Sequence, residues 1–240
     1  MGRNYLLVDD NRAFAENVAE IVRDFGDEVA VADSGPRALE LARLRRFQAV
    51  ITDMRMPLMG GAELVREIRK IDPGVAAIVV TAHVADAELQ AARREGLLAV
   101  LGKPVPIHPL LDLLGAARRD GLVAVVEDDL DLSENICEVM RGRGFSAVTA
   151  ATVLETDWPG AARPFAGLVD LRVPGGPAGE AMLRLGARFP GLPLVVMSGY
   201  DDPAPAPCAV RLTKPFPSAV LLEALERFHA AATPTLAPRP

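Results

Sequence analysis

Tyr5–Asp10 (YLLVDD) places two acids directly after an apolar run, and Leu122–Asp128 (LVAVVED) repeats this arrangement in the second half of the chain. In each half, further apolar runs lead to a lone aspartate, then to a hydroxyl residue, and then to Lys-Pro. These residues are Asp53, Thr81 and Lys103-Pro104 in the first half, and Asp170, Ser198 and Lys214-Pro215 in the second. The lone aspartate precedes the hydroxyl residue by 28 positions in both halves. Ordered self-similarity of this kind indicates two copies of one domain.

The length of 240 residues leaves room for one or two domains of about 100 to 200 residues, and the repeat favours two. We predict a first domain over residues 1–120 and a second over 121–232. Residues 233–240 form a Pro-rich tail that we expect to be unstructured. Half of the residues are hydrophobic, so each domain can bury a core of its own.

The apolar runs alternate with segments whose apolar residues recur every three or four positions, as in helices. Nearly all-apolar strands that alternate with helices indicate a parallel sheet covered on both faces, which is an α/β fold. In the first half we predict strands near 4–8, 28–32, 49–53, 77–81 and 99–102, and a last helix over about 106–119. In the second half we predict a last helix near 218–231.

The second copy departs from the first in two places. Only 16 positions separate Ser198 from Lys214, whereas 22 separate Thr81 from Lys103, and the shorter segment carries prolines at 203, 205 and 207. Proline at alternate positions cannot sustain a helix interior, so we expect the second domain to lack its fourth helix. Its second helix, near 153–158, should also be short because Pro159-Gly160 follows.

Composition argues against several functions. The formal net charge is −6, and we find no basic stretch of the kind that binds DNA or RNA directly. We also find no apolar run near the roughly 18 residues of a membrane span, nor a signal peptide at the N-terminus, so we expect a cytoplasmic protein. Cys137 and Cys208 have no metal-binding spacing and are interpreted as reduced packing thiols.

The repeated polar residues predict a site at one edge of each sheet, because side chains at the carboxyl ends of parallel strands converge there. In the first domain, Asp9, Asp10 and Asp53 would be crowded together, which requires protonation or a neutralising cation. Oxygen ligands favour Mg²⁺. Asp53 could then attack phosphorus and form an aspartyl phosphate. Lys103 would contribute positive charge, and Thr81 a hydroxyl donor.

Together, these residues resemble the receiver domain of bacterial two-component response regulators. The first half matches through Asp9-Asp10, Asp53–Pro57 (DMRMP), Thr81-Ala82 and Lys103-Pro104. The second half matches through Glu127-Asp128, Asp170–Gly175 (DLRVPG), Ser198-Gly199 and Lys214–Phe216 (KPF). The resemblance implies two flavodoxin-like (βα)5 domains, each with a five-stranded parallel sheet in the order 2-1-3-4-5 and helices on both faces.

The resemblance also implies roles for individual residues. Asp53 and Asp170 would accept phosphoryl groups from a histidine kinase or a histidine phosphotransfer protein. Asp10 and Asp128 would bind Mg²⁺ directly, and Asp9 and Glu127 mainly through water. The backbone carbonyls of Arg55 and Arg172 would complete the set of metal ligands, while Thr81, Ser198, Lys103 and Lys214 would contact the phosphoryl group.

One departure concerns the aromatic residue that receivers usually carry three positions before the lysine. Val100 and Arg211 occupy those positions here, so the usual aromatic switch is missing from both domains. The predicted fourth helix of the first domain, near 85–95, is the better candidate for a homodimer surface.

We weigh three functions. The leading one is a signalling regulator without an effector domain, which works through phosphorylation-dependent protein contacts or as a relay or sink. It would not be classed as an enzyme, although it would phosphorylate itself from small phosphodonors and could catalyse its own dephosphorylation. The alternative is a binding or dimerisation module in which only the first receiver is phosphorylated and the second is a pseudo-receiver. The third is a Mg²⁺-dependent phosphatase, which would be expected to carry a second acid two positions after its nucleophile, where Arg55 and Arg172 stand.

Overall fold

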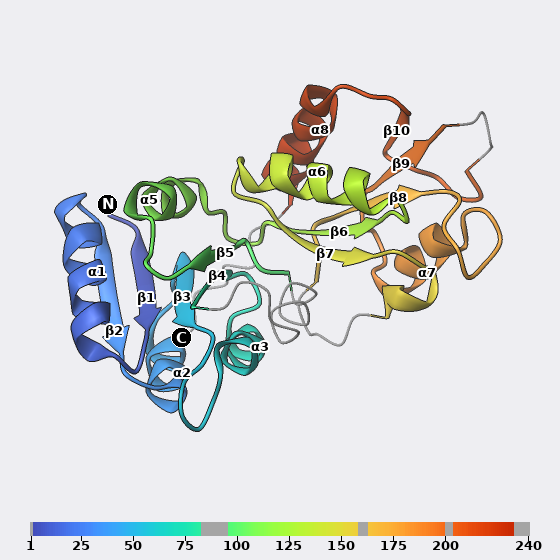
Figure 1. Cartoon of the computed structure of the whole chain (residues 1–240). Coiled ribbons are helices and arrows are strands. Elements are labelled where there is room, and N and C mark those ends of the chain that lie inside the picture. The colour runs from blue at the N-terminus through green and yellow to red at the C-terminus, as the bar shows by residue number, and fades with distance from the viewer. Residues whose placement is uncertain (1, 83–95, 158–162, 200–203, 233–240) are drawn as a thin grey trace. The chain divides into compact units, whose positions relative to one another are not determined.

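The computed structural model describes residues 2–82, 96–157, 163–199 and 204–232. These residues divide into two compact units, the first ending at Arg119 and the second beginning at Asp120. We call them the first and second domains and describe each by itself (Figure 1). The predicted helix at 85–95 and the predicted tail at 233–240 lie outside the described residues.

The first domain contains one parallel sheet in the order β2-β1-β3-β4-β5. This order and the parallel pairing confirm the predicted flavodoxin-like arrangement. Its elements are β1 Asn4–Val8, α1 Arg12–Asp24, β2 Glu28–Ala32, α2 Gly35–Leu44, β3 Ala49–Asp53, α3 Gly61–Ile71, β4 Ala76–Thr81, β5 Ala99–Gly102 and α5 Ile107–Ala116.

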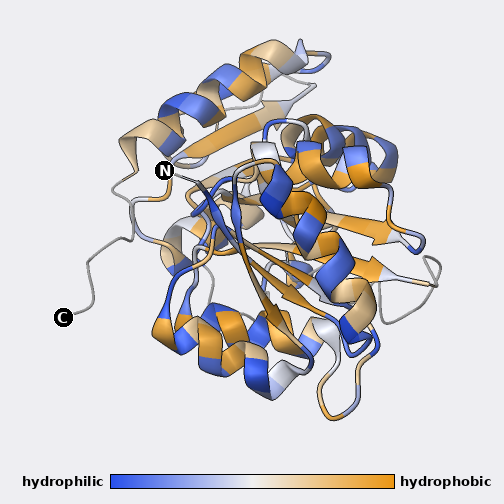
Figure 2. Ribbon diagram, turned by 90° about the vertical axis from the view of Figure 1, so that its left-hand side faces the viewer, coloured by the Kyte–Doolittle hydropathy of each residue, from blue (hydrophilic) through white to orange (hydrophobic). Residues whose placement is uncertain are grey.

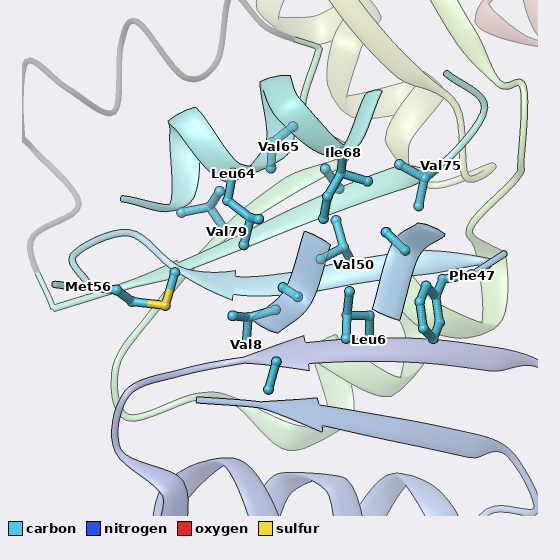
Figure 3. Close-up of a cluster of buried hydrophobic side chains, with 14 of the residues drawn as sticks. Leu6, Val8, Phe47, Val50, Met56, Leu64, Val65, Ile68, Val75 and Val79 are labelled. Atoms are coloured by element: carbon cyan, nitrogen blue, oxygen red, sulfur yellow. The ribbon is translucent and has the colours of Figure 1, made fainter. Parts of the chain in front are cut away.

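Successive side chains of β1 enter two separate cores, as a strand covered on both faces requires. Leu6 and Val8 belong to a cluster that includes Ile68 of α3. Figure 3 shows this cluster, with Ile68 on the helix and Leu6 and Val8 on the strand. Tyr5 and Leu7 belong to a second cluster with residues of α1 and α5. Figure 2 shows the matching distribution of hydropathy: the strands are mostly hydrophobic, while the helices carry both hydrophobic and hydrophilic residues.

Helix α5 is shorter than the predicted helix over 106–119, since it ends at Ala116. Side chains from the start of the chain satisfy the carbonyls at this end. The Tyr5 hydroxyl donates to the Leu114 carbonyl at 3.0 Å, and the Arg3 guanidinium donates to the Gly115 carbonyl at 2.5 Å. Helices end most easily where their last carbonyls find such donors.

The second domain repeats the sheet in the order β10-β9-β8-β6-β7, which is the same topology in reverse listing. Its elements are β6 Leu122–Val126, α6 Leu130–Arg141, β7 Ser146–Ala150, the 3₁₀ turn η1 Leu154–Thr156, β8 Ala166–Asp170, α7 Glu180–Arg188, β9 Leu194–Ser198, β10 Val210–Thr213 and α8 Ser218–Ala231. Among the described residues up to 157, the second helical segment is a single 3₁₀ turn, where the sequence predicts a short helix near 153–158.

Between β9 and β10, the described residues 199 and 204–209 form no helix. Pro205 instead packs against Gly179 at the start of α7. A Cβ on Gly179 would lie 2.3 Å from the Cγ of Pro205, and Gly179 has φ of +82°, so this position requires glycine on both counts. The predicted loss of helical structure in this domain is confirmed for these residues, and Pro205 packs against the residue that precedes α7.

All helices among the described residues are too short or too polar to cross a bilayer.

Candidate functional site

The sequence-predicted residues of the first domain meet at the carboxyl edge of its sheet. Asp9 and Asp10 follow β1, Asp53 is the last residue of β3, and Thr81 is the last residue of β4. Lys103 follows β5, and its amide donates to the Thr81 carbonyl at 2.8 Å. Parallel pairing of neighbouring strands brings these ends together, since all the strands point the same way.

Three carboxylates form the acidic part of this site. Asp9, Asp10 and Asp53 each place one oxygen within 4.8 Å of the others. Asp10 is exposed, whereas the Asp9 and Asp53 side chains are only 2% and 12% exposed. One carboxylate therefore faces solvent while two are held in a largely dry environment.

Lys103 supplies the cation next to the two buried acids. Its Nζ lies 2.7 Å from Asp9 Oδ2 and 3.3 Å from Asp53 Oδ2. The other oxygen of Asp9, Oδ1, accepts from the amide of Asn11 at 2.9 Å. Asp9 thus has a partner on each oxygen, and the lysine contacts Asp53 less closely.

Burial and neighbouring charges together raise the pKa values of both Asp53 and Lys103. Burial raises the pKa of Asp53, an effect that the Lys103 charge opposes and the Asp9 charge reinforces. For Lys103, burial acts to lower the pKa, but the hydrogen bond to Asp9 and the charges of Asp9 and Asp53 outweigh it, so the pKa is raised. Lys103 is therefore kept as a cation at neutral pH.

The second domain assembles the corresponding site. Glu127, Asp128 and Asp170 again place oxygens within 4.8 Å of one another, with Asp128 exposed. Lys214 Nζ lies 2.7 Å from Glu127 Oε2 and 2.5 Å from Asp170 Oδ2. Burial raises the pKa of Glu127, although the Lys214 hydrogen bond and charge oppose this rise. In this copy the lysine is close to both acids.

The remaining predicted residues surround the two clusters. Thr81 and Ser198 are each 3% exposed, and the Ser198 carbonyl accepts from the amide of Lys214 at 2.9 Å. Arg55 and Arg172 are exposed, two positions after the lone aspartates. The amide of Arg172 donates to Asp170 Oδ1 at 2.7 Å.

The positions of the missing aromatic switch have different environments. Val100 packs against the core cluster that contains Ile68, and Arg211 is exposed. His83, which directly follows Thr81-Ala82, lies outside the described residues.

Three neighbours of the two sites, Phe14, Asn11 and Asp129, were not predicted from the sequence. Phe14 of α1 places its ring below the Lys103 ammonium, with 4.7 Å from Nζ to the ring centroid. Asn11 and Asp129 cap α1 and α6 while their amides donate to the first acid of each pair. An Asx residue just before a helix could have indicated the caps, whereas the Phe14 contact has no sequence signal.

The donor set suits a divalent cation. All candidate side-chain ligands are carboxylate oxygens, the type that Mg²⁺ prefers, and Mg²⁺ binds such oxygens at about 2.0–2.1 Å. Oxygens within 4.8 Å of one another are compatible with an ion that contacts some of them directly and others through water. Acidic triads of this type, one in each domain, are typical of receiver Mg²⁺ sites.

Comparison with known proteins agrees with this geometry. The model of the response regulator receiver domain family matches residues 5–114. A response regulator receiver protein of Anaeromyxobacter sp. (strain Fw109-5) is 64% identical over 236 residues, which cover 98% of this chain and 99% of that protein. The chain therefore belongs to the response regulator receiver proteins of two-component signalling, and it carries the receiver fold twice.

Two further matches cover about one domain's length. The transcriptional regulatory protein GlrR of Escherichia coli (strain K12) is 35% identical over 100 residues, which cover 42% of this chain and 22% of that protein. A solved receiver domain of a sensor histidine kinase from Pseudomonas aeruginosa PAO1, with a magnesium ion in its active-site cleft, is 28% identical. It covers 48% of this chain and 95% of that chain, with a TM-score of 0.44.

Proposed function

We propose that this chain is a phosphorylation-dependent signalling regulator whose two domains accept phosphoryl groups on Asp53 and Asp170. The donor would be a histidine kinase or a histidine phosphotransfer protein, the partner that receiver domains generally have. The output would be a change in protein contacts, or passage of the phosphoryl group along a relay or into a sink. The observation that carries the proposal is the same acid triad with an adjacent lysine in both domains.

The chemistry follows from the residues around Asp53. A carboxylate oxygen of Asp53 would attack the donor phosphorus, so that an O–P bond forms and the P–N bond to the donor imidazole breaks. The imidazole leaves with a proton from solvent. The Lys103 ammonium would balance charge on the phosphoryl oxygens, and the Thr81 hydroxyl would donate to one of them.

A divalent cation fits this account through the residues that would hold it. Asp10 and Asp128 would ligate Mg²⁺ directly, Asp9 and Glu127 mainly through water, and the carbonyls of Arg55 and Arg172 would add ligands. Bound Mg²⁺ would neutralise the charge that develops on the phosphoryl oxygens. Lys214 and Ser198 would have the roles of Lys103 and Thr81 in the second domain.

A second candidate keeps phosphorylation in the first domain alone and makes the second a binding module. The close approach of Lys214 to Asp170, at 2.5 Å, favours it. The Arg172 amide donates to the other oxygen of Asp170 at 2.7 Å, so both oxygens of this carboxylate have close partners, whereas Lys103 lies 3.3 Å from Asp53.

The experiment is to incubate the chain with Mg²⁺ and acetyl phosphate and to count phosphate adducts by intact mass. The controls are Asp53→Asn, Asp170→Asn and the double variant, each with and without EDTA. Two adducts, each lost with its own aspartate and both lost with EDTA, are expected. One adduct that disappears with Asp53→Asn alone would support the binding-module candidate, and label in the double variant would contradict the assignment of both acceptors.

A further inference from the structure

Phe14 and Leu132 occupy the same position in the first helix of each domain, four residues after the second acid of the pair. The Asn11 side chain accepts from the amide of Phe14 at 3.1 Å, and the Asp129 side chain accepts from the amide of Leu132 at 3.0 Å. Both backbones are thus held by an equivalent cap, from Asn11 in one domain and Asp129 in the other, while the side chain at the position itself changes from an aromatic ring to leucine.

The caps also connect these positions to the acid pairs. The amide of Asn11 donates to Asp9 at 2.9 Å, and the amide of Asp129 donates to Glu127 at 3.3 Å. Residue 14 is therefore tied through a short, ordered turn to the carboxylate that shares the lysine.

The lysines of the two domains take different positions relative to the acceptor aspartate. Lys103 lies 2.7 Å from Asp9 and 3.3 Å from Asp53, and its ammonium is 4.7 Å from the centroid of the Phe14 ring. In the second domain, where Leu132 offers no ring, Lys214 lies 2.7 Å from Glu127, the same distance as Lys103 from Asp9, but only 2.5 Å from Asp170. The lysine next to the aromatic ring is the one that is farther from its acceptor.

A ring face attracts an ammonium group by about 0.5–1 kcal/mol at an exposed site. Lys103 is 25% exposed, so an attraction of this order acts on the ammonium in addition to its two ion pairs. The ring favours positions of Nζ on the α1 side, where Asp9 is, and thereby weakens the ion pair with Asp53.

We propose that Phe14 is a positioning residue for phosphoryl transfer to Asp53. Its ring draws the Lys103 ammonium away from Asp53, so that their ion pair, at 3.3 Å, competes less with attack of the Asp53 carboxylate on phosphorus than the 2.5 Å pair of the second domain does for Asp170. This role rests on the proposed function and explains why the two acceptors should react at different rates.

The kinetic test uses chains that carry a single acceptor. With Asp170→Asn, the change Phe14→Leu should slow labelling of Asp53 by acetyl phosphate about two- to fivefold, which is the rate equivalent of about 0.5–1 kcal/mol. Phe14→Trp should keep the original rate, because it keeps the ring. With Asp53→Asn, the change Leu132→Phe should speed labelling of Asp170.

Leucine is the residue that the second copy carries at this position, so Phe14→Leu is compatible with the fold. A drop in rate caused only by looser packing would not be reversed by the ring of tryptophan. Nor would it be accompanied by faster labelling in Leu132→Phe.

The spectroscopic test is independent of phosphorylation. The chain has three lysines, Lys70, Lys103 and Lys214, so selective ¹³C labelling of lysine gives three ε-methylene signals. The Lys103 signal should be shifted upfield by the Phe14 ring current and should move toward the other two in Phe14→Leu.

An unshifted Lys103 signal, or a labelled parent whose rate Phe14→Leu does not change, would overturn the role of Phe14 alone. A parent chain that takes no label at all would overturn the proposed function together with this role.

Discussion

The last strands of the two sheets, β5 and β10, are similar on one face and differ in polarity on the other. Leu101 and Leu212 both pack toward the first and last helices of their domains. On the opposite face, Val100 packs into a core cluster, while Arg211 and Thr213 are exposed. Among the described residues, the second domain thus has fewer helices and carries polar side chains on this face of its last strand, which avoids an exposed apolar edge.

The carboxyl edges of the same sheets differ much less. Both keep three carboxylates, a buried hydroxyl residue and a lysine in contact with two acids. The acidic site is therefore the same in a domain with fewer described helices, because its residues lie at strand ends and in short loops rather than on the flanking helices.

The largest effect that we predict on stability is specific to the first domain. Asp72, at the end of α3, is buried and pairs with Arg119 at 2.5 Å and with Arg46 at 3.2 Å. The second domain has Phe189 at the corresponding position. Asp72→Ala should lower the free energy of unfolding of the first domain by about 3–5 kcal/mol, because it leaves two guanidinium groups without their counter-charge.

Urea denaturation followed by hydrogen exchange of peptides from each domain would measure this loss. Glu40→Ala is the control, since Glu40 and its partner Arg37 are both more than half exposed and such a pair contributes about 0–1 kcal/mol. Equal losses in the two variants would show that the Asp72 cluster is not a buried ion pair in solution.

The next effect distinguishes the domains by alkaline pH. Burial raises the pKa of the Cys137 thiol to about 11, whereas Ala19, at the matching position of the first domain, cannot titrate. Above about pH 9 the unfolded chain releases the thiol proton and the folded chain keeps it. The free energy of unfolding of the second domain should therefore fall by about 1.4 kcal/mol per pH unit up to pH 11.

Cys137→Ala should remove this component of the slope, which is measured as the difference between the two chains in urea denaturation at pH 8 to 11. In the first domain, burial raises the pKa of Tyr5 above its usual value of 10.0. The alkaline loss of stability caused by Tyr5 should thus begin about one pH unit higher than the loss caused by Cys137. Parallel slopes for the parent and Cys137→Ala would exclude a buried neutral thiol.

The smallest effect concerns the loop after each acceptor. Leu58 has φ of +70° and is 91% exposed, and Gly175, at the same position of the second domain, has φ of +98°. Gly175→Ala should destabilise the second domain by about 1 kcal/mol, because an L side chain is strained at positive φ. Leu58→Gly should change the first domain by less than about 0.5 kcal/mol, because relief of strain is offset by greater freedom of the unfolded chain.

Thermal unfolding of the two variants beside the parent would check this asymmetry. A large loss in Leu58→Gly would mean that the exposed leucine side chain has contacts that stabilise the first domain.

Most of the fold was predictable because a polar residue ends the apolar run of each strand that leads to the site. Asp53, Thr81 and Ser198 each close an apolar run and also end a strand in the structure. The end of α5 was not predictable, since Arg3 and Tyr5 reach it from more than 100 positions away.

The residues of the site could be gathered from sequence because parallel strands bring their ends to one edge. The Phe14 contact could not, because the apolar spacing of α1 already accounts for Phe14 as a core residue, and it does pack against a core cluster. A side chain with two roles gives a sequence signal only for the commoner one.

The polar face of β10 limits how this domain could change. A longer connection between β9 and β10 that folded into a helix over the sheet would cover Arg211 and Thr213 and would have to desolvate a guanidinium group. Insertion alone would therefore be resisted, and regaining a full helical layer would require apolar replacements on the strand first. The order of those steps makes the reduced form of the second domain hard to reverse.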